Sequence, residues 1–230
     1  MMLSPDDWEV VRLSLQVGFV AVLAMLPLAF ALAYLLARAR FPGRLLLDAI
    51  VHLPLVLPPV VTGWLLLLAF GRSGPVGAWL ERWLGLTLMF RWTGAALAAA
   101  VMALPLMVRA IRLSIEAVDR RLEGAARTLG AGRWRTFATI TVPLSLPGIA
   151  AGLVLGFARA IGEFGATISF VSNIPGETRT LPLAIYAALQ LPGGEQQVVR
   201  LAIFSVVLSL GALLASEVLM RRMGRQAHVL

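Results

Sequence analysis

Long apolar stretches, separated by shorter segments that carry the charges, dominate the chain. Residues 13–37 form 25 consecutive positions without a charge, enough for one α-helix to cross a hydrocarbon core of about 30 Å. Five stretches are predicted to span a membrane in this way: 13–37, 49–70, 92–108, 144–171 and 201–220. We therefore expect an all-α membrane protein in which residues 1–230 form a single transmembrane domain.

Two of these stretches contain residues that are unusual in a membrane span. The second holds Pro54, Pro58 and Pro59, which lack a backbone N–H and predict a kink. The fourth is interrupted by Arg159 and Glu163, whose charges are costly in a bilayer unless they are paired or hydrated. These residues are candidates for a site as well as for irregular packing.

Two connections are longer than a minimal helical bundle needs. Residues 109–143 are predicted to form a large loop on one side of the membrane and residues 172–200 a large loop on the other. Within the latter, residues 181–191 are apolar but too few to span, and they predict a short helix on or dipping into the outer surface.

The arginines indicate the orientation, because short cytoplasmic loops retain positive charge. If the N-terminus lies outside, thirteen arginines fall in cytoplasmic segments and six in outer ones, with Arg159 inside a span. We expect the N-terminus outside and the C-terminus in the cytoplasm.

Composition supports a membrane protein and excludes several activities. Hydrophobic residues make up 59% and charged residues 14%, against about 45–50% and 25% in soluble domains. All 20 basic residues are arginine, so no lysine is available to hold nucleotide phosphates in a P-loop or to form a Schiff base. There is no cysteine, and two histidines are too few to predict a metal site. The arginines lie between apolar runs, which indicates membrane topology rather than nucleic-acid binding.

The loop at 109–143 contains a short amphipathic helix. Asp119 is a typical N-cap and Gly130 a typical C-terminal stop, so a helix is predicted over about 120–129, with small or apolar residues on one face. A second helical stretch is expected over 133–140 before Pro143 breaks the chain. The pattern fits a helix that binds a groove on a soluble partner, and it fits equally a helix that lies on lipid headgroups.

The sequence EGAARTLGAGRWRTFATITVP, residues 123–143, resembles the EAA loop of ABC-importer permeases. Five positions match that motif, while Gly124 stands where the family has its acidic residue and Glu123 lies one place earlier. The resemblance implies that this loop couples the chain to a separate ATPase. The implied coupling residues are Glu123, Gly124, Ala125, Ala126, Leu129, Gly130, Ile140 and Pro143.

Residues 41–67 and 158–186 resemble, more narrowly, the molybdate permeases of ABC importers. The resemblance implies a five-span type I importer permease with cytoplasmic coupling helices, in the bacterial inner membrane. It implies a second copy of this chain, two ATPase subunits that bind ATP and Mg, and a periplasmic oxyanion-binding protein. The chain itself would be no enzyme and would hold no cofactor and no metal.

Three groups of residues are candidates for the transport site. Arg159 and Glu163 are four residues apart on one helical face, so they either line the translocation pathway or form an ion pair that fixes packing. Pro58 and Pro59 either form a gate or a static kink. The polar loop with Asn173, Glu177 and Arg179 is either a docking site for the binding protein or an ordinary solvated turn.

The substrate remains open at this point. Sulfate, tungstate or another oxyanion is the nearest alternative to molybdate, and a channel or carrier that works without an ATPase is an alternative of a different class.

Overall fold

The computed structural model describes residues 4–227, and every regular element in that range is helical. The four long helices are α1 (Pro5–Arg38), α5 (Trp92–Ala117), α8 (Val142–Ile161) and α11 (Glu195–Ala227). The shorter helices are α2 (Arg44–Val56), α3 (Pro59–Phe70), α4 (Pro75–Leu84), α6 (Arg120–Thr128), α7 (Arg133–Thr136), the π-helix η1 (Phe137–Thr141), α9 (Gly165–Val171) and α10 (Leu181–Leu189).

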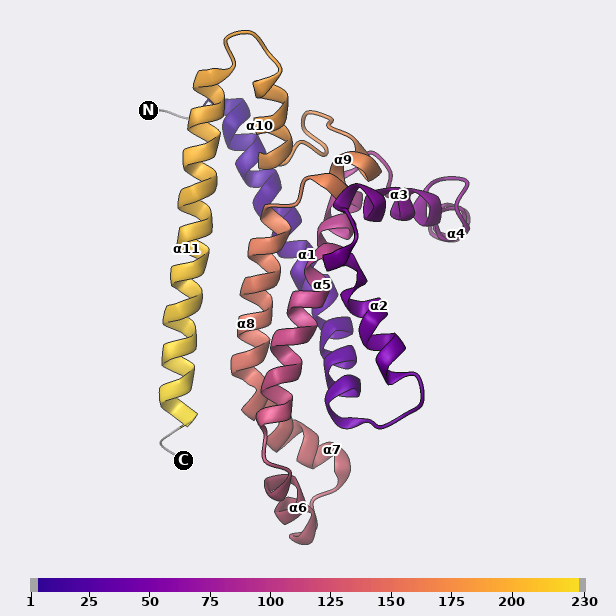
Figure 1. Cartoon of the computed structure of the whole chain (residues 1–230), viewed down its shortest axis with the longest axis vertical. Coiled ribbons are helices and arrows are strands. Elements are labelled where there is room, and N and C mark those ends of the chain that lie inside the picture. Colours follow the sequence, from indigo (N-terminus) through magenta and orange to yellow (C-terminus); the bar gives the residue numbers. More distant parts are fainter. Residues whose placement is uncertain (1–3, 228–230) are drawn as a thin grey trace.

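The long helices lie along the long axis of the molecule and run in both directions. In Figure 1, α1, α5 and α11 run from the upper to the lower end, while α2 and α8 run upward. Helices α6 and α7 lie at the lower end, whereas α10 lies at the upper end beside the start of α1. The two segments predicted to be large loops on opposite sides of the membrane therefore lie at opposite ends of the molecule.

Helix α1 begins at a capping box. The Ser4 hydroxyl accepts a hydrogen bond from the Asp7 N–H at 3.1 Å, and the Ser4 N–H donates to the Asp7 carboxylate at 3.1 Å. This arrangement satisfies two backbone donors that the first helical turn would otherwise leave unpaired. The helix starts well before the predicted span, so its first two turns extend beyond the uncharged stretch.

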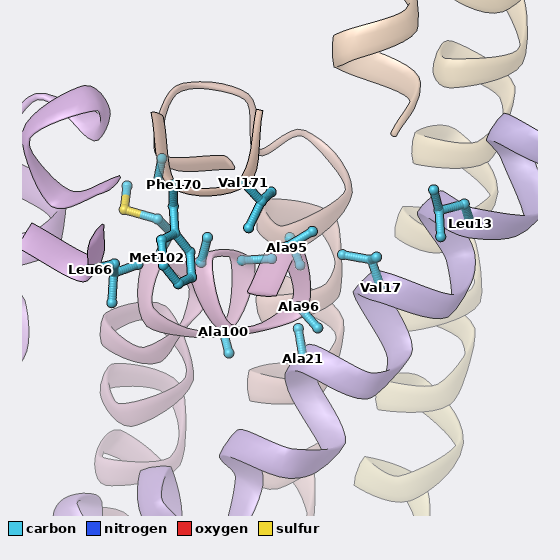
Figure 2. Packing of buried hydrophobic residues seen from close by; sticks show 14 residues of the cluster. Leu13, Val17, Ala21, Leu66, Ala95, Ala96, Ala100, Met102, Phe170 and Val171 are labelled. Atoms are coloured by element: carbon cyan, nitrogen blue, oxygen red, sulfur yellow. The ribbon is translucent and has the colours of Figure 1, made fainter. Parts of the chain in front are cut away.

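Helix α5 lies at the centre of the molecule and packs mainly against α1 and α8. Its first half presents a row of buried alanines between α1 on one side and α9 on the other, as Figure 2 shows for Ala95, Ala96 and Ala100. Phe170 and Val171 of α9 close this cluster from above. Small side chains let helix backbones approach closely, which favours van der Waals contact in a membrane.

Three glycines of α8, each four residues from the next, form the matching surface against α5. A Cβ atom at Gly148 would overlap Ser114, and one at Gly156 would lie 2.7 Å from Cγ of Met107. At Gly152 the nearest atoms would again belong to α5. The spacing places all three on one face of the helix, as in the small-xxx-small pattern of membrane helix pairs.

The second predicted span, 49–70, is not one kinked helix. The chain breaks at Leu57 and Pro58, and α3 leaves α2 at an angle of 115°. Leu57 and Pro58 are both extended, since a residue before proline avoids the helical region and neither Pro58 nor Pro59 can donate a backbone hydrogen bond. Pro54, by contrast, lies inside α2.

The fourth predicted span, 144–171, is also wrong at both ends. Pro143 does not break the chain, because a continuous helix runs over Arg133–Ile161. The π-helix η1 precedes Pro143, and Pro143 occupies the first turn of α8, where a proline is tolerated. At the other end, the helix stops at Ile161 and the chain turns at Gly162 into the separate helix α9.

Two further elements, α5 and α4, differ from the prediction. Helix α5 continues to Ala117, past the predicted end at Val108, so the loop that follows is shorter than expected. Helix α4 was not predicted; it starts with Pro75 and ends at Gly85 in the left-handed conformation.

Length and composition identify α1, α5 and the helix Arg133–Ile161 as able to cross a membrane. Counting the bent pair α2 and α3 as one span makes four within the described residues. The predicted span 201–220 falls within α11. A total of five therefore stays a prediction.

The contact between α3 and α9 depends on Gly63. A Cβ there would lie 2.5 Å from the carbonyl oxygen of Ala166 and 2.8 Å from Cβ of Ser169. We expect Gly63→Ala to lower the free energy of unfolding by about 1–3 kcal/mol, because backbone atoms must move apart. Thermal unfolding of the detergent-solubilised protein measures the effect. Gly124→Ala is the control, since a Cβ at Gly124 meets nothing within 4 Å; equal melting temperatures for the two variants would contradict the tight contact.

Candidate functional site

The amphipathic helix predicted in the long loop is confirmed as α6. The Asp119 carboxylate accepts the Arg121 N–H at 2.8 Å and caps its start. The helix ends at Thr128, and Gly130 follows with a φ of +85°, a conformation that suits glycine. Figure 1 shows α6 at the lower tip of the molecule, below the ends of α5 and α8.

Apolar side chains near this tip are exposed rather than packed. Leu129 is 88% exposed and Trp134 of α7 is 84% exposed, while Leu122 is half exposed. No neighbouring atom lies within 4 Å of a Cβ built at Gly124 or Gly130. Exposed large apolar side chains beside open backbone are typical of a surface that another protein covers.

The remaining predicted coupling residues lie on α6 itself or on the helical segment η1 and α8 that follows α7. Ala125 is exposed and Ala126 half-buried on α6. Ile140 is half-buried in η1, and Pro143 is exposed at the start of α8.

Glu123 is turned toward the membrane helices. Its Oε1 atom lies 3.0 Å from Nη2 of Arg38, the last residue of α1, and accepts a hydrogen bond from Oγ1 of Thr141 at 2.8 Å. Sequence reasoning places Glu123 in the coupling loop but gives no sign of these partners, which lie far from it in the chain.

Arg159 and Glu163 form an ion pair within the structure. The Arg159 Nη2 atom lies 2.7 Å from Oε2 of Glu163, and the other carboxylate oxygen of Glu163 accepts the Ala166 N–H at 2.7 Å. The Glu163 side chain is 2% exposed, whereas that of Arg159 is 24% exposed. Glu163 therefore neutralises Arg159 and also caps the first turn of α9.

The proline break and the Glu163 turn meet in space. A Cβ at Gly165 would lie 2.7 Å from Cβ of Pro59, so the start of α9 rests against the start of α3. Pro58 directly precedes α3, at its N-cap position. The structure thus brings together the pathway candidates from two separate predicted spans.

The loop between α9 and α10 is held by internal hydrogen bonds. The Arg179 Nε donates to Oδ1 of Asn173 at 3.1 Å, and the buried Thr178 hydroxyl donates to the Ser172 carbonyl at 3.0 Å. Glu177 is exposed on the loop. A turn with this many fixed contacts presents a defined surface rather than a mobile one.

A cavity of about 310 Å³ lies beside this loop at the upper end of the molecule. Asp6, Glu9 and Arg179 supply its charged groups, and the side chains of Val10 and Leu191 are among its apolar ones. The cavity is open to the outside, so the side chain of a docked protein has room to enter.

Buried Asp7 fixes the start of α1 next to this cavity. It lies 3.2 Å from Nε of Arg200 and accepts a hydrogen bond from Nε2 of Gln197 at 3.3 Å, so α1 is joined to α11. Burial by itself would raise the pKa of Asp7, but the hydrogen bonds from Ser4 and Gln197 and the charge of Arg200 hold that pKa below its ordinary value. Asp7 therefore stays ionised at neutral pH.

A second polar cluster, which sequence reasoning missed, joins α2 to α5 near the lower end. The Asp48 carboxylate lies 3.1 Å from Nη1 of Arg112 and 3.2 Å from Nδ1 of His52, and Arg112 also pairs with Glu116 at 2.9 Å. The spacing of four residues within each helix was the available signal.

Comparison with known proteins places these features in a family. Residues 19–225 match the family described as "Binding-protein-dependent transport system inner membrane component". The chain is 60% identical over 221 residues to the molybdenum transport system permease protein ModB of Escherichia coli K12, covering 96% of both chains. It is 58% identical over 216 residues to ModB of Haemophilus influenzae, and this match covers 94% of both chains.

More distant similarities agree with the fold. The sulfate transport system permease protein CysT of Escherichia coli is 35% identical over 233 residues, covering 95% of this chain and 82% of CysT. A solved bacterial alginate ABC transporter, in complex with a pentasaccharide-bound periplasmic protein, matches with a TM-score of 0.74 and 22% identity. The match covers 96% of this chain and 80% of the transporter chain. The chain, with its apolar helices and its family match over nearly its whole length, belongs to the inner-membrane components of binding-protein-dependent transport systems.

Proposed function

We propose that this chain is the permease subunit of an ATP-driven importer that carries molybdate across the bacterial inner membrane. The observation that carries the proposal is the 60% identity, over 96% of both chains, to a molybdenum transport permease. Sulfate remains the principal alternative substrate, because a sulfate permease is 35% identical over most of the chain. The other possibility is a channel or carrier that needs no ATPase.

The proposed assembly contains two copies of this chain, two ATPase subunits and a periplasmic binding protein. The exposed apolar side chains of Leu122, Leu129 and Trp134 support an ATPase contact at the tip formed by α6 and α7. The fixed loop with Asn173, Glu177 and Arg179, beside an open cavity at the opposite end, supports docking of a binding protein there. This assignment makes the start of α1 periplasmic and the end of α11 cytoplasmic.

In this assembly, ATP and Mg bind to the ATPase subunits, and this chain converts their movement into a change of access. Closure of the ATPases would displace α6, and α6 would carry the adjoining ends of the membrane helices with it. The passage would then open outward, and inward again after hydrolysis. This chain needs no nucleotide site of its own, in keeping with the absence of lysine.

The Arg159 and Glu163 pair fits a passage for a dianion. A neutralised arginine that is one quarter exposed offers hydrogen-bond donors to an oxyanion without a net positive charge that would retain it. The adjoining contact between Pro59 and Gly165 gives α3 and α9 a shared pivot.

Uptake of labelled molybdate at nanomolar concentration tests the substrate. Cells with the gene are expected to accumulate molybdate, and cells without it are not. The uptake should survive excess unlabelled sulfate and disappear when ATP is depleted. Abolition by sulfate would favour a broader oxyanion permease, and uptake that is insensitive to ATP depletion would favour a channel or an ion-coupled carrier.

Substitution of Gly130 tests whether the loop that contains α6 couples transport to the ATPase. We expect Gly130→Val to abolish most uptake, since a β-branched residue is strained at a φ of +85° and its side chain would enter the space of the partner. Gly130→Asn is the matched control, because asparagine tolerates this conformation, and it should retain more uptake. Membrane insertion of both variants is checked by immunoblot; normal uptake by the valine variant would contradict the coupling role.

Substitution of Glu163 tests whether the ion pair with Arg159 lines the translocation pathway. Glu163→Gln keeps an oxygen that can accept the Ala166 N–H but leaves Arg159 with an uncompensated charge. In a passage, that charge should retain the anion, so both the maximal rate and the apparent KM should fall, each by about tenfold. The double variant Arg159→Gln/Glu163→Gln should recover part of the rate. A loss of protein from the membrane with unchanged KM would instead indicate that the pair only fixes packing.

A further inference from the structure

Glu123 is the one acidic side chain of α6, and it does not face outward. Its carboxylate contacts Arg38 and Thr141, and its side chain is 16% exposed. The neighbouring residues Gly124 and Ala125 are exposed. The outward face of α6 thus offers arginines and apolar groups to a partner, while its single carboxylate is used inside the protein.

Arg38 joins the end of α1 to the end of α5 and to α6. It is the last residue of α1, and its Nη2 atom donates both to Glu123 of α6 and to the carbonyl of Val118, which ends α5, at 3.3 Å. The Arg38 side chain is 12% exposed. A guanidinium at two helix C-termini is favoured by the negative ends of their dipoles, so this geometry is stabilised independently of Glu123.

Thr141 extends the same cluster to α8. It is buried, it closes the π-helix η1, and its hydroxyl donates to the carboxylate oxygen that Arg38 contacts. Since η1 runs without a break into α8, Glu123 is joined through one oxygen atom to α1 and to the start of α8. Among the residues whose side chains the structure describes, Glu123 makes all the side-chain hydrogen bonds between α6 and other helices.

The backbone connection of α6 is weak by comparison. On its C-terminal side the chain passes through Gly130 and Gly132, with Gly130 at positive φ. On its N-terminal side Asp119 forms a short extended link after α5. Without the side-chain contacts, a displacement of α6 could be absorbed by rotation at these links.

We propose that Arg38 and Glu123, supported by Thr141, form a clamp that transmits the displacement of α6 to α1 and α8. Glu123 is thereby a positioning residue of the permease and not a contact to the ATPase. The inference rests on the proposed function, because it presupposes a partner that moves α6. Glu123 lies one residue before the acidic position of the EAA motif, and the resemblance by itself would suggest that its carboxylate contacts the ATPase.

The decisive measurement is the amount of molybdate transported per ATP hydrolysed by the complete transporter, reconstituted in liposomes with its ATPase and binding protein. We expect Glu123→Gln to copurify with the ATPase as the unmodified chain does and to sustain ATP hydrolysis, while molybdate transported per ATP falls by about tenfold. Glu116→Gln is the matched control. It removes a carboxylate that pairs at 2.9 Å with Arg112 on its own helix and joins no two elements, so the ratio should stay unchanged.

Exchanging the two charges tests whether Arg38 and Glu123 act through their mutual contact or are each required for a separate reason. Arg38→Glu and Glu123→Arg should each lower the ratio, and the double variant should restore at least part of it because opposite charges face one another again. Loss of copurification with the ATPase in Glu123→Gln would overturn the proposal in favour of a direct ATPase contact. A normal ratio in Glu123→Gln, or failure of the exchange to rescue assembled complexes, would overturn it too.

A substrate-independent measurement distinguishes failure of the clamp from failure of the proposed function. The chain contains no cysteine, so Arg38→Cys/Glu123→Cys carries the only two thiols, and a short bifunctional thiol reagent should link them in membranes. The linked chain, cleaved between the two positions, should remain one band on a non-reducing gel. Absence of the link would overturn the clamp whatever the substrate, whereas a link in this variant together with no molybdate transport by the unmodified complex would overturn the substrate assignment alone.

Discussion

Helices α5 and α8 contact one another closely through residues without bulky side chains, and α1 and α9 pack against the same central helix α5. Gly148, Gly152 and Gly156 leave room for the backbone and side chains of α5, and the alanines of α5 leave room for α1. In a bilayer, burial of apolar surface gives little drive for helix association, so tight packing must hold the helices together. With α5 fixed between α1 and α8, the two ends of these helices carry the candidate sites.

Several charged groups lie at helix ends, where they make hydrogen bonds to backbone groups. The Glu163 carboxylate accepts a backbone N–H in the first turn of α9, the Asp7 carboxylate accepts the Ser4 N–H at the start of α1, and Arg38 donates to the carbonyl that follows α5. A charge that also satisfies helix-end groups loses less on leaving water than an isolated one. This explains how ion pairs that join separate helices can persist at or near the membrane, in positions where movement would have to be transmitted.

Two irregular points of the backbone that are distant in the sequence lie together in space. The break at Pro58 and the turn at Glu163 come from regions that a hydropathy pattern treats as two continuous spans, yet Pro59 packs on Gly165. Non-helical backbone at membrane depth is tolerated where it is covered by protein or lines a water-filled cavity. At their meeting point the contact between α3 and α9 covers the irregular backbone with protein.

The helical class, the apolar stretches, the short helix after Asp119 and the family resemblance can all be predicted from the sequence, because they depend on local periodicity, capping residues and fixed motif spacing. The sequence by itself did not determine that 49–70 breaks by 115°, that Pro143 continues a helix, or that Glu123 faces Arg38. Those outcomes depend on partners distant in the chain. Whether a proline kinks, breaks or starts a helix, and which way a carboxylate points, is decided by the packing and hydrogen bonds that only the tertiary structure supplies.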